Sequence, residues 1–201
     1  MSTTTPDTKT KLIDAALDLI WKGSYGSVSV DDICRAADVR KGSFYHYFPS
    51  KVDLALAVME ESHRLMEPEF DVIFSPRIPA LQRFERFADF VYRSQSEAAA
   101  KYHQVCGCPC TSLGSEMAGQ EACIRDKYEE ITRRKERYYQ NALRDMIAEG
   151  LLPPQTDVNA VAEEINTYII GQLVIARIQN NLEHLKRDLK IGLLKILGVE
   201  R

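Results

Sequence analysis

Two short segments of the sequence gather side chains whose types and spacing could do chemistry. Between Val39 and Lys51 there are three cations and no acid, interleaved with hydroxyl and aromatic groups. Such side chains donate hydrogen bonds, and phosphates and base edges are surfaces that accept many of them. The first segment is therefore a small basic site, although the whole chain carries a net charge of -3.

The second segment is His103 to Cys110, in which Cys106, Cys108 and Cys110 stand at alternate positions. Thiolates bind soft metals or metalloids and can be oxidised, so this cluster could sense a metal or an oxidant. It lacks the paired knuckles of structural zinc sites, and we predict no bound metal and no cofactor. The alternative is that the cysteines line a core or a pocket as small apolar side chains.

The sequence lacks the constellations that enzymes use. It contains no Gly-x-Gly-x-x-Gly, no phosphate-loop Lys-Ser/Thr and no His-Glu-x-x-His, and its four histidines are scattered. We therefore predict no catalytic residues. A helical module that binds other proteins is a further non-enzymatic alternative.

No apolar stretch is long enough to cross a membrane. The longest run near the C-terminus, Tyr168–Ile178, is interrupted by Gly171, Gln172 and Arg177, whereas a span needs about 20 apolar residues. The N-terminus is polar and carries no export signal. We therefore predict a cytoplasmic protein that contacts no membrane and keeps its thiols reduced.

Helical patterns surround the basic segment. Apolar residues spaced by three and four predict a helix over 10–22, Ser29 can cap a second helix, and 41–48 forms a third that Pro49 stops. Ser50 opens a fourth helix. The second and third helices form a helix-turn-helix whose small, cationic and aromatic groups suit a major groove. Many helical cores contain such a pair, so geometry alone is a weak signal.

The rest of the chain is also expected to be helical. After a linker marked by Pro68, Pro76 and Pro79, helices are expected over about 81–92, 120–149, 157–180 and 184–197, and 105–112 is a turn or a helix start. The fold class is thus all-α, with about nine helices. We expect an N-terminal DNA-binding domain over 1-50 and a helical domain over 51-201.

The string from Ser29 to Lys51, above all Gly-Ser-Phe-Tyr-His-Tyr-Phe-Pro-Ser-Lys at 42–51, resembles the TetR family of bacterial regulators almost position by position. Two residues depart from the family pattern: Cys34 replaces the usual Ala and Asp38 the usual Gly, and Asp tolerates a left-handed backbone. The resemblance implies a repressor released from a palindromic operator by a small molecule; activation is the alternative, because operator position sets the sign.

The resemblance also assigns roles to side chains. Arg40, Lys41 and Gly42 would meet base edges, since cations donate to guanine and a glycine lets the backbone approach closely. The donors expected to hold phosphates are Ser29, Ser43, Tyr45, His46, Tyr47 and Lys51. Phe44 and Phe48 are expected in the core, and packing is the alternative role for the two tyrosines.

The implied partners are double-stranded operator DNA, a small-molecule effector and a second copy of the chain. The last two helices are the expected dimer contact, although their apolar residues could equally be core: Ile169, Ile170, Leu173, Val174, Leu189, Leu193, Leu194 and Leu197. The expected effector pocket comprises Phe87, Phe90, His103, Cys106, Cys108, Cys110, Met117, Tyr128, Tyr168 and Gln172. Residues 107–116 resemble a turn found in a subset of the family, which gives Cys108 a structural role.

Overall fold

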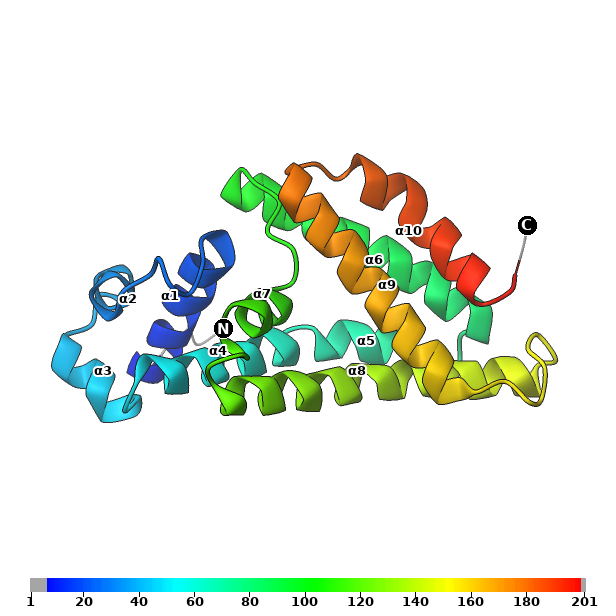
Figure 1. Ribbon diagram of the computed structural model, residues 1–201, viewed down its shortest axis with the longest axis horizontal. Coiled ribbons are helices and arrows are strands. Elements are labelled where there is room, and N and C mark those ends of the chain that lie inside the picture. The colour runs from blue at the N-terminus through cyan, green and yellow to red at the C-terminus, as the bar shows by residue number, and fades with distance from the viewer. Residues whose placement is uncertain (1–6, 200–201) are drawn as a thin grey trace, which may run out of the picture. The chain divides into compact units, whose positions relative to one another are not determined.

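The computed structural model describes residues 7–199, and in this part of the chain all regular structure is helical. The helices in chain order (Figure 1) are α1 (Thr8–Lys22), α2 (Val30–Ala37), α3 (Lys41–Tyr47), α4 (Lys51–Arg64), α5 (Glu67–Ile73), α6 (Ala80–Tyr102), α7 (Pro109–Met117), α8 (Ala122–Ala148), α9 (Val158–Gln179) and α10 (Glu183–Ile196). The predicted all-α class is confirmed. None of the described helices is long and apolar enough to span a membrane.

Local signals set the boundaries of the first four helices. The expected caps are present. The side chains of Ser29 and Ser50 each accept a hydrogen bond from the backbone N–H three residues on, and the Asp side chain at that position accepts one from the backbone N–H of the serine. Asp38 ends α2 in the left-handed region, with φ 52°. This short polar residue therefore fills the role that glycine has in most helix ends.

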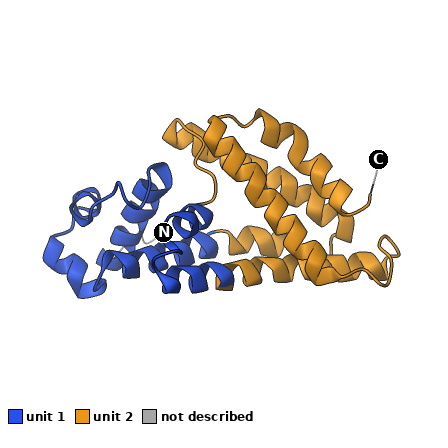
Figure 2. Cartoon of the chain, viewed as in Figure 1, with its two compact units in different colours: residues 1–65, 109–129 blue, residues 66–108, 130–201 orange. Residues whose placement is uncertain are grey.

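The chain forms two compact units (Figure 2). Among the described residues, the head unit comprises 7–65 and 109–129, so that it contains α7 and the first part of α8 together with α1 to α4. The C-terminal unit comprises residues 66–108 and 130–199 of the part of the chain that the structure describes. The functional division at residue 50 stays a prediction.

Helix α5 lies in the segment that the prolines led us to predict as a linker, so that prediction was wrong for residues 67–73. Pro68 occupies the first turn of α5, where a backbone N–H needs no intrahelical acceptor. Phe70 and Ile73 are buried in the C-terminal unit. This apolar burial stabilises a helix that is too short to form alone.

The core of the C-terminal unit contains a connected group of aromatic rings. Neighbouring centroids lie 5.2 to 6.5 Å apart in this group, which comprises Phe70, Phe74, Phe84, Phe87, Phe90, Tyr138 and Tyr139. Tyr138 donates to Asp71 at 2.6 Å. Aromatic pairs at these separations add to the stability that burial alone provides.

Most of the apolar residues expected at a dimer contact are core residues instead. Ile169, Leu173, Leu189, Leu193 and Leu197 are buried within the C-terminal unit itself. The large apolar side chains that α9 and α10 leave exposed are Val174, Ile175, Ile178 and Ile191. Because buried positions on α9 recur every three or four residues, the exposed ones form a separate face of the same helix.

Candidate nucleic-acid interface

Helix α3 has a buried side and an exposed side. Phe44 and the C-cap residue Phe48 are buried in the head unit, as expected. The remaining side chains lie on the surface, with Ser43 half-buried and Arg40, Lys41, Tyr45, His46 and Tyr47 exposed. Tyr45 keeps 51% of its surface exposed, more than a ring used only for packing needs.

Gly42 faces open space near the start of α3. A Cβ placed on Gly42 would meet no atom within 4 Å, so packing within the protein does not require a glycine. Glycine in a helix costs about 1 kcal/mol relative to alanine. The open space in front of Gly42 is therefore suited to close approach by another surface.

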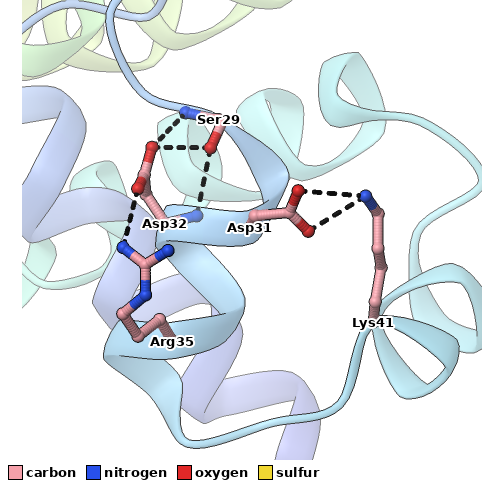
Figure 3. Close-up of polar contacts among 5 residues, drawn as sticks. All are labelled: Ser29, Asp31, Asp32, Arg35 and Lys41. Carbon is pink, nitrogen blue, oxygen red and sulfur yellow. Dashed lines mark hydrogen bonds and ion pairs between the residues drawn. The ribbon is translucent and has the colours of Figure 1, made fainter.

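Ser29 and Asp32 cap the N-terminus of α2 (Figure 3). The hydroxyl of Ser29 accepts from the N–H of Asp32 at 3.1 Å and donates to its carboxylate at 2.6 Å. The hydroxyl and the N–H of Ser29 stabilise the charged carboxylate and hold the pKa of Asp32 below its ordinary value. The expected phosphate contact of Ser29 stays a prediction, and it requires the hydroxyl to exchange Asp32 for a phosphate.

Lys41, the first residue of α3, pairs with an acid of α2 (Figure 3). Its Nζ lies 2.9 Å from one carboxylate oxygen of Asp31 and 3.2 Å from the other. The hydrogen bond and charge of Asp31 raise the pKa of Lys41. Both side chains are exposed, so a phosphate or a base can compete for the ammonium group.

Lys51, the first residue of α4, is engaged inside the head unit. Its ammonium donates to the carbonyl of Tyr25 and lies 3.8 Å from the centroid of the Tyr25 ring. Burial lowers the pKa of Lys51, and the charge of Glu116 opposes that shift. The phosphate contact expected of Lys51 stays a prediction.

Comparison with known proteins places this arrangement in a family. The model for bacterial regulatory proteins of the tetR family matches residues 12–58, and the model for a tetracyclin repressor-like C-terminal domain matches residues 80–191. The transcriptional regulator AcuR of Cereibacter sphaeroides is 34% identical over 157 residues, which cover 76% of this chain and 68% of the relative. This chain belongs to the TetR family.

Other TetR-family relatives match nearly the whole chain. An HTH-type transcriptional regulator in the lacX 3' region of Lactococcus lactis is 25% identical over 186 residues, covering 90% of this chain and 89% of that one. The crystal structure of a regulatory protein TetR from Rhodobacter sphaeroides has a TM-score of 0.78 and 28% identity, covering 94% and 96% of the two chains. The protein is thus a DNA-binding transcriptional regulator of a family whose members are typically dimeric repressors.

The Asp31–Lys41 pair gives this TetR head a testable property. Asp31→Asn should tighten binding to non-operator DNA about threefold and binding to the operator by less, so that the ratio of operator to non-operator affinity falls, because the released ammonium can reach any phosphate. Fluorescence anisotropy with an operator and a scrambled duplex, at several salt concentrations, measures both effects. Asp126→Asn in α8 makes the same charge change in the head unit, and equal results for the two variants would contradict the prediction.

The residues expected to line an effector pocket fall in both units. Cys110, Met117 and Tyr128 belong to the head unit, and the other seven belong to the C-terminal unit. Phe87 and Phe90 are buried in the aromatic core, and His103 is exposed.

Tyr168 lies against α10. Its hydroxyl donates to the carbonyl of Asp188 at 2.9 Å, and a Cβ on Gly192 would overlap the Tyr168 hydroxyl. The ring thus fixes the packing of α9 on α10. Whether the predicted set also binds an effector stays a prediction.

Two of the three cysteines of the cluster are buried, whereas Cys108 is half-buried. Cys106 and Cys110 are buried, and their thiols donate to the carbonyls of Gln104 and Met59 at 3.5 and 3.6 Å. Among residues 7–199 no three His, Cys, Asp or Glu side chains come together as a metal site would need. These observations favour the structural interpretation, and sensing by the cluster stays a prediction.

Sequence reasoning assigned no role to three polar side chains that hold irregular segments of the two units. The Gln95 side chain is buried and exchanges two hydrogen bonds with Gly107, and Asn180 accepts from the N–H of Val105 at 2.8 Å. The carboxylate of Glu116 accepts hydrogen bonds from the backbone of the turn before α2. The first two contacts join residues 12 and 75 positions apart, so no local pattern in the sequence indicates them.

Proposed function

We propose that this TetR-family regulator is a repressor that binds a palindromic operator as a homodimer and releases it when a small molecule binds. The exposed start of α3, with the open space in front of Gly42, supports docking of this helix in the major groove. Two copies of so short a helix, related by two-fold symmetry, read a palindrome. We also propose that the protein acts in the cytoplasm, where its operator would lie, and that it has no catalytic residues.

The exposed side chains of α3 supply the contacts. Arg40 and Lys41 reach base edges beside Gly42, and hydroxyl groups and cations flanking them hold phosphates: Ser29, Ser43, Tyr45, His46, Tyr47 and Lys51. The exposure of Tyr45 and Tyr47 supports their part in this set. On binding DNA, the Ser29 hydroxyl exchanges the Asp32 carboxylate for a phosphate, and the Lys51 ammonium exchanges the Tyr25 carbonyl for one.

These contacts can be tested by measuring the affinity of variants for a duplex that the wild-type protein has selected from a random DNA pool. Lys41→Ala and Tyr45→Phe should each weaken binding about tenfold, because each removes one hydrogen bond to DNA, worth about 1 to 1.5 kcal/mol. The control is Lys195→Ala, which removes an exposed cation of α10. Unchanged binding by the Lys41→Ala, Tyr45→Phe double variant would exclude the proposed α3 contacts.

The apolar face of α9 is the proposed dimer contact. Gly171, Val174, Ile175 and Ile178 follow the spacing i, i+3, i+4, i+7, which places them on one face, and no atom lies within 4 Å of a Cβ on Gly171. A small residue there lets a second helix approach closely. We call these four residues, with Ile191 of α10, the α9 stripe.

We further propose that the effector acts through the C-terminal unit. The C-terminal unit has an aromatic core and a buried segment around Cys106, and small organic effectors bind in pockets lined mostly by apolar and aromatic side chains. A panel of hydrophobic compounds, thiophilic metals and oxidants can be tested for release of the selected duplex. The compounds that release it would identify the chemical class of the effector. Release by oxidants or metals alone would instead support the thiol-sensing alternative.

A further inference from the structure

Glu116 of α7 holds the turn between α1 and α2 by two hydrogen bonds. The N–H of Tyr25 donates to one carboxylate oxygen at 2.9 Å, and the N–H of Gly26 donates to the other at 2.6 Å. Both oxygens are therefore occupied by adjacent backbone groups. Hydrogen bonds to a charged acceptor are about twice as strong as neutral ones.

The same turn is held from its other side by α4. The carbonyl of Tyr25 accepts from Lys51, whose ammonium also lies over the Tyr25 ring. One short turn thus connects Glu116 of α7 with the first residue of α4. Because α3 and α4 are separated only by residues 48–50, the turn also bears on the position of α3.

The fit at Gly26 is tight. A Cβ on Gly26 would lie 2.9 Å from the carboxylate of Glu116, closer than real Cβ contacts. Any larger residue at 26 must therefore displace the carboxylate. The carboxylate can therefore hold both N–H groups in its observed position only with glycine at 26.

Helix α7 begins immediately after a segment that is fixed in the C-terminal unit. Gly107 is held by the two hydrogen bonds to Gln95, and Val105 by Asn180. Pro109, the first residue of α7, follows Gly107 by two positions. Movement of this segment therefore reaches α7 through the covalent chain.

We propose that Glu116 is a positioning residue through which α7 controls the α1–α2 turn, and with it the alignment of α3 for operator binding. When the carboxylate holds both N–H groups, Tyr25 presents its carbonyl and ring to Lys51, and α4 and α3 are aligned. When α7 shifts, both bonds are lost together. The inference rests on the proposed function and deepens it, because it names a contact inside the head unit, close in the chain to the C-terminal unit, on which the alignment of α3 depends.

The first test uses Glu116→Gln in the full-length protein. A glutamine side chain offers one acceptor and sets its NH2 against the second N–H, so affinity for the selected duplex should fall about fivefold. If only the charge of residue 116 mattered, Glu116→Gln would instead tighten DNA binding, because the change removes a negative charge that repels the phosphates. Glu121→Gln is the matched control: Glu121 also acts on Tyr25 by its charge, and this variant should bind as tightly as the wild type or more tightly.

The second test is a double-mutant cycle. Gly26→Ala should weaken binding about as much as Glu116→Gln, but should cost nothing further in a Glu116→Ala background, where the methyl group has room. Additive effects would overturn the proposal even if single variants lose stability. Hydrogen exchange provides a readout without DNA: the amides of Tyr25 and Gly26 should exchange faster in Glu116→Gln, and unchanged exchange would also overturn it.

Lys41→Ala separates this inference from the proposed function. If Lys41→Ala weakens binding and Glu116→Gln does not, only the role of Glu116 is wrong. If neither variant changes affinity, the assignment of α3 is wrong as well.

Discussion

Gly42→Leu should reduce operator affinity about a hundredfold or more while leaving the fold unchanged. The site is open in the protein, since no atom lies within 4 Å of a Cβ on Gly42. Leucine is also a better helix former than glycine, so α3 should become more stable by about 0.5 to 1 kcal/mol. If α3 docks in a major groove, however, the added isobutyl group occupies the space that the DNA must fill.

The magnitude follows from what is displaced. Moving the helix start away from the bases removes the contacts of Arg40 and Lys41 together, and each good base contact is worth about 1 to 3 kcal/mol. Two such losses amount to about 2 to 6 kcal/mol, a range that spans the ~2.7 kcal/mol that corresponds to a hundredfold change. Anisotropy with the selected duplex measures the affinity, and thermal unfolding measures the fold.

Gly119→Leu is the matched control. Gly119 lies in the head unit between α7 and α8, and it too faces open space. The same side chain at this position should leave operator affinity within about twofold of wild type. Wild-type affinity in Gly42→Leu would mean that α3 does not approach DNA through its first turn.

The DNA-binding head could be predicted from sequence because its signals are local. Ser29 and Ser50 are caps with their acids three residues on, Pro49 stops α3, and Asp38 turns the chain. Each of these features acts within a few residues, so the helix boundaries follow from the sequence alone. The buried sides of α1 and α3 follow from the 3.6-residue period in the same way.

The contacts that tie elements together could not be predicted in this way. Glu116 meets Tyr25 across 91 positions, and the resemblance of residues 107–116 to a turn found in part of the family does not identify the partner of Glu116. On α9, apolar residues occur on both faces, so periodicity does not decide which face meets the core; Leu173 is buried and Ile178 is not. Pro68 indicated a linker, yet burial of Phe70 stabilises a helix there.

Ile178→Glu should convert the dimer into monomers and thereby weaken binding to a palindromic operator about a hundredfold. Ile178 keeps 77% of its surface exposed within the protomer, so the substitution removes little packing and should leave protomer stability almost unchanged. In a two-fold interface the same patch meets itself. Each substitution therefore places two carboxylates in the apolar contact, where charge is costly to desolvate.

DNA affinity should fall because the two DNA-binding heads are no longer joined in one dimer. In the dimer, the first bound head holds the second beside its half-site at a high effective concentration, and this advantage disappears in the monomer. Binding to a single half-site should accordingly be the same for Ile178→Glu and wild type. Sedimentation equilibrium measures the assembly state, and anisotropy with palindromic and half-site duplexes measures the two affinities.

Val72→Glu controls for the general effect of an exposed charge. Val72 of α5 belongs to the same unit, is 65% exposed and lies outside the α9 stripe, so this variant should stay dimeric. Gly171→Leu adds a test of opposite kind, because the protomer has space for the side chain but a closely packed second helix does not. If Ile178→Glu and Gly171→Leu both remain dimeric, the two copies do not meet through the α9 stripe, and a different face must set the spacing of the DNA-reading heads.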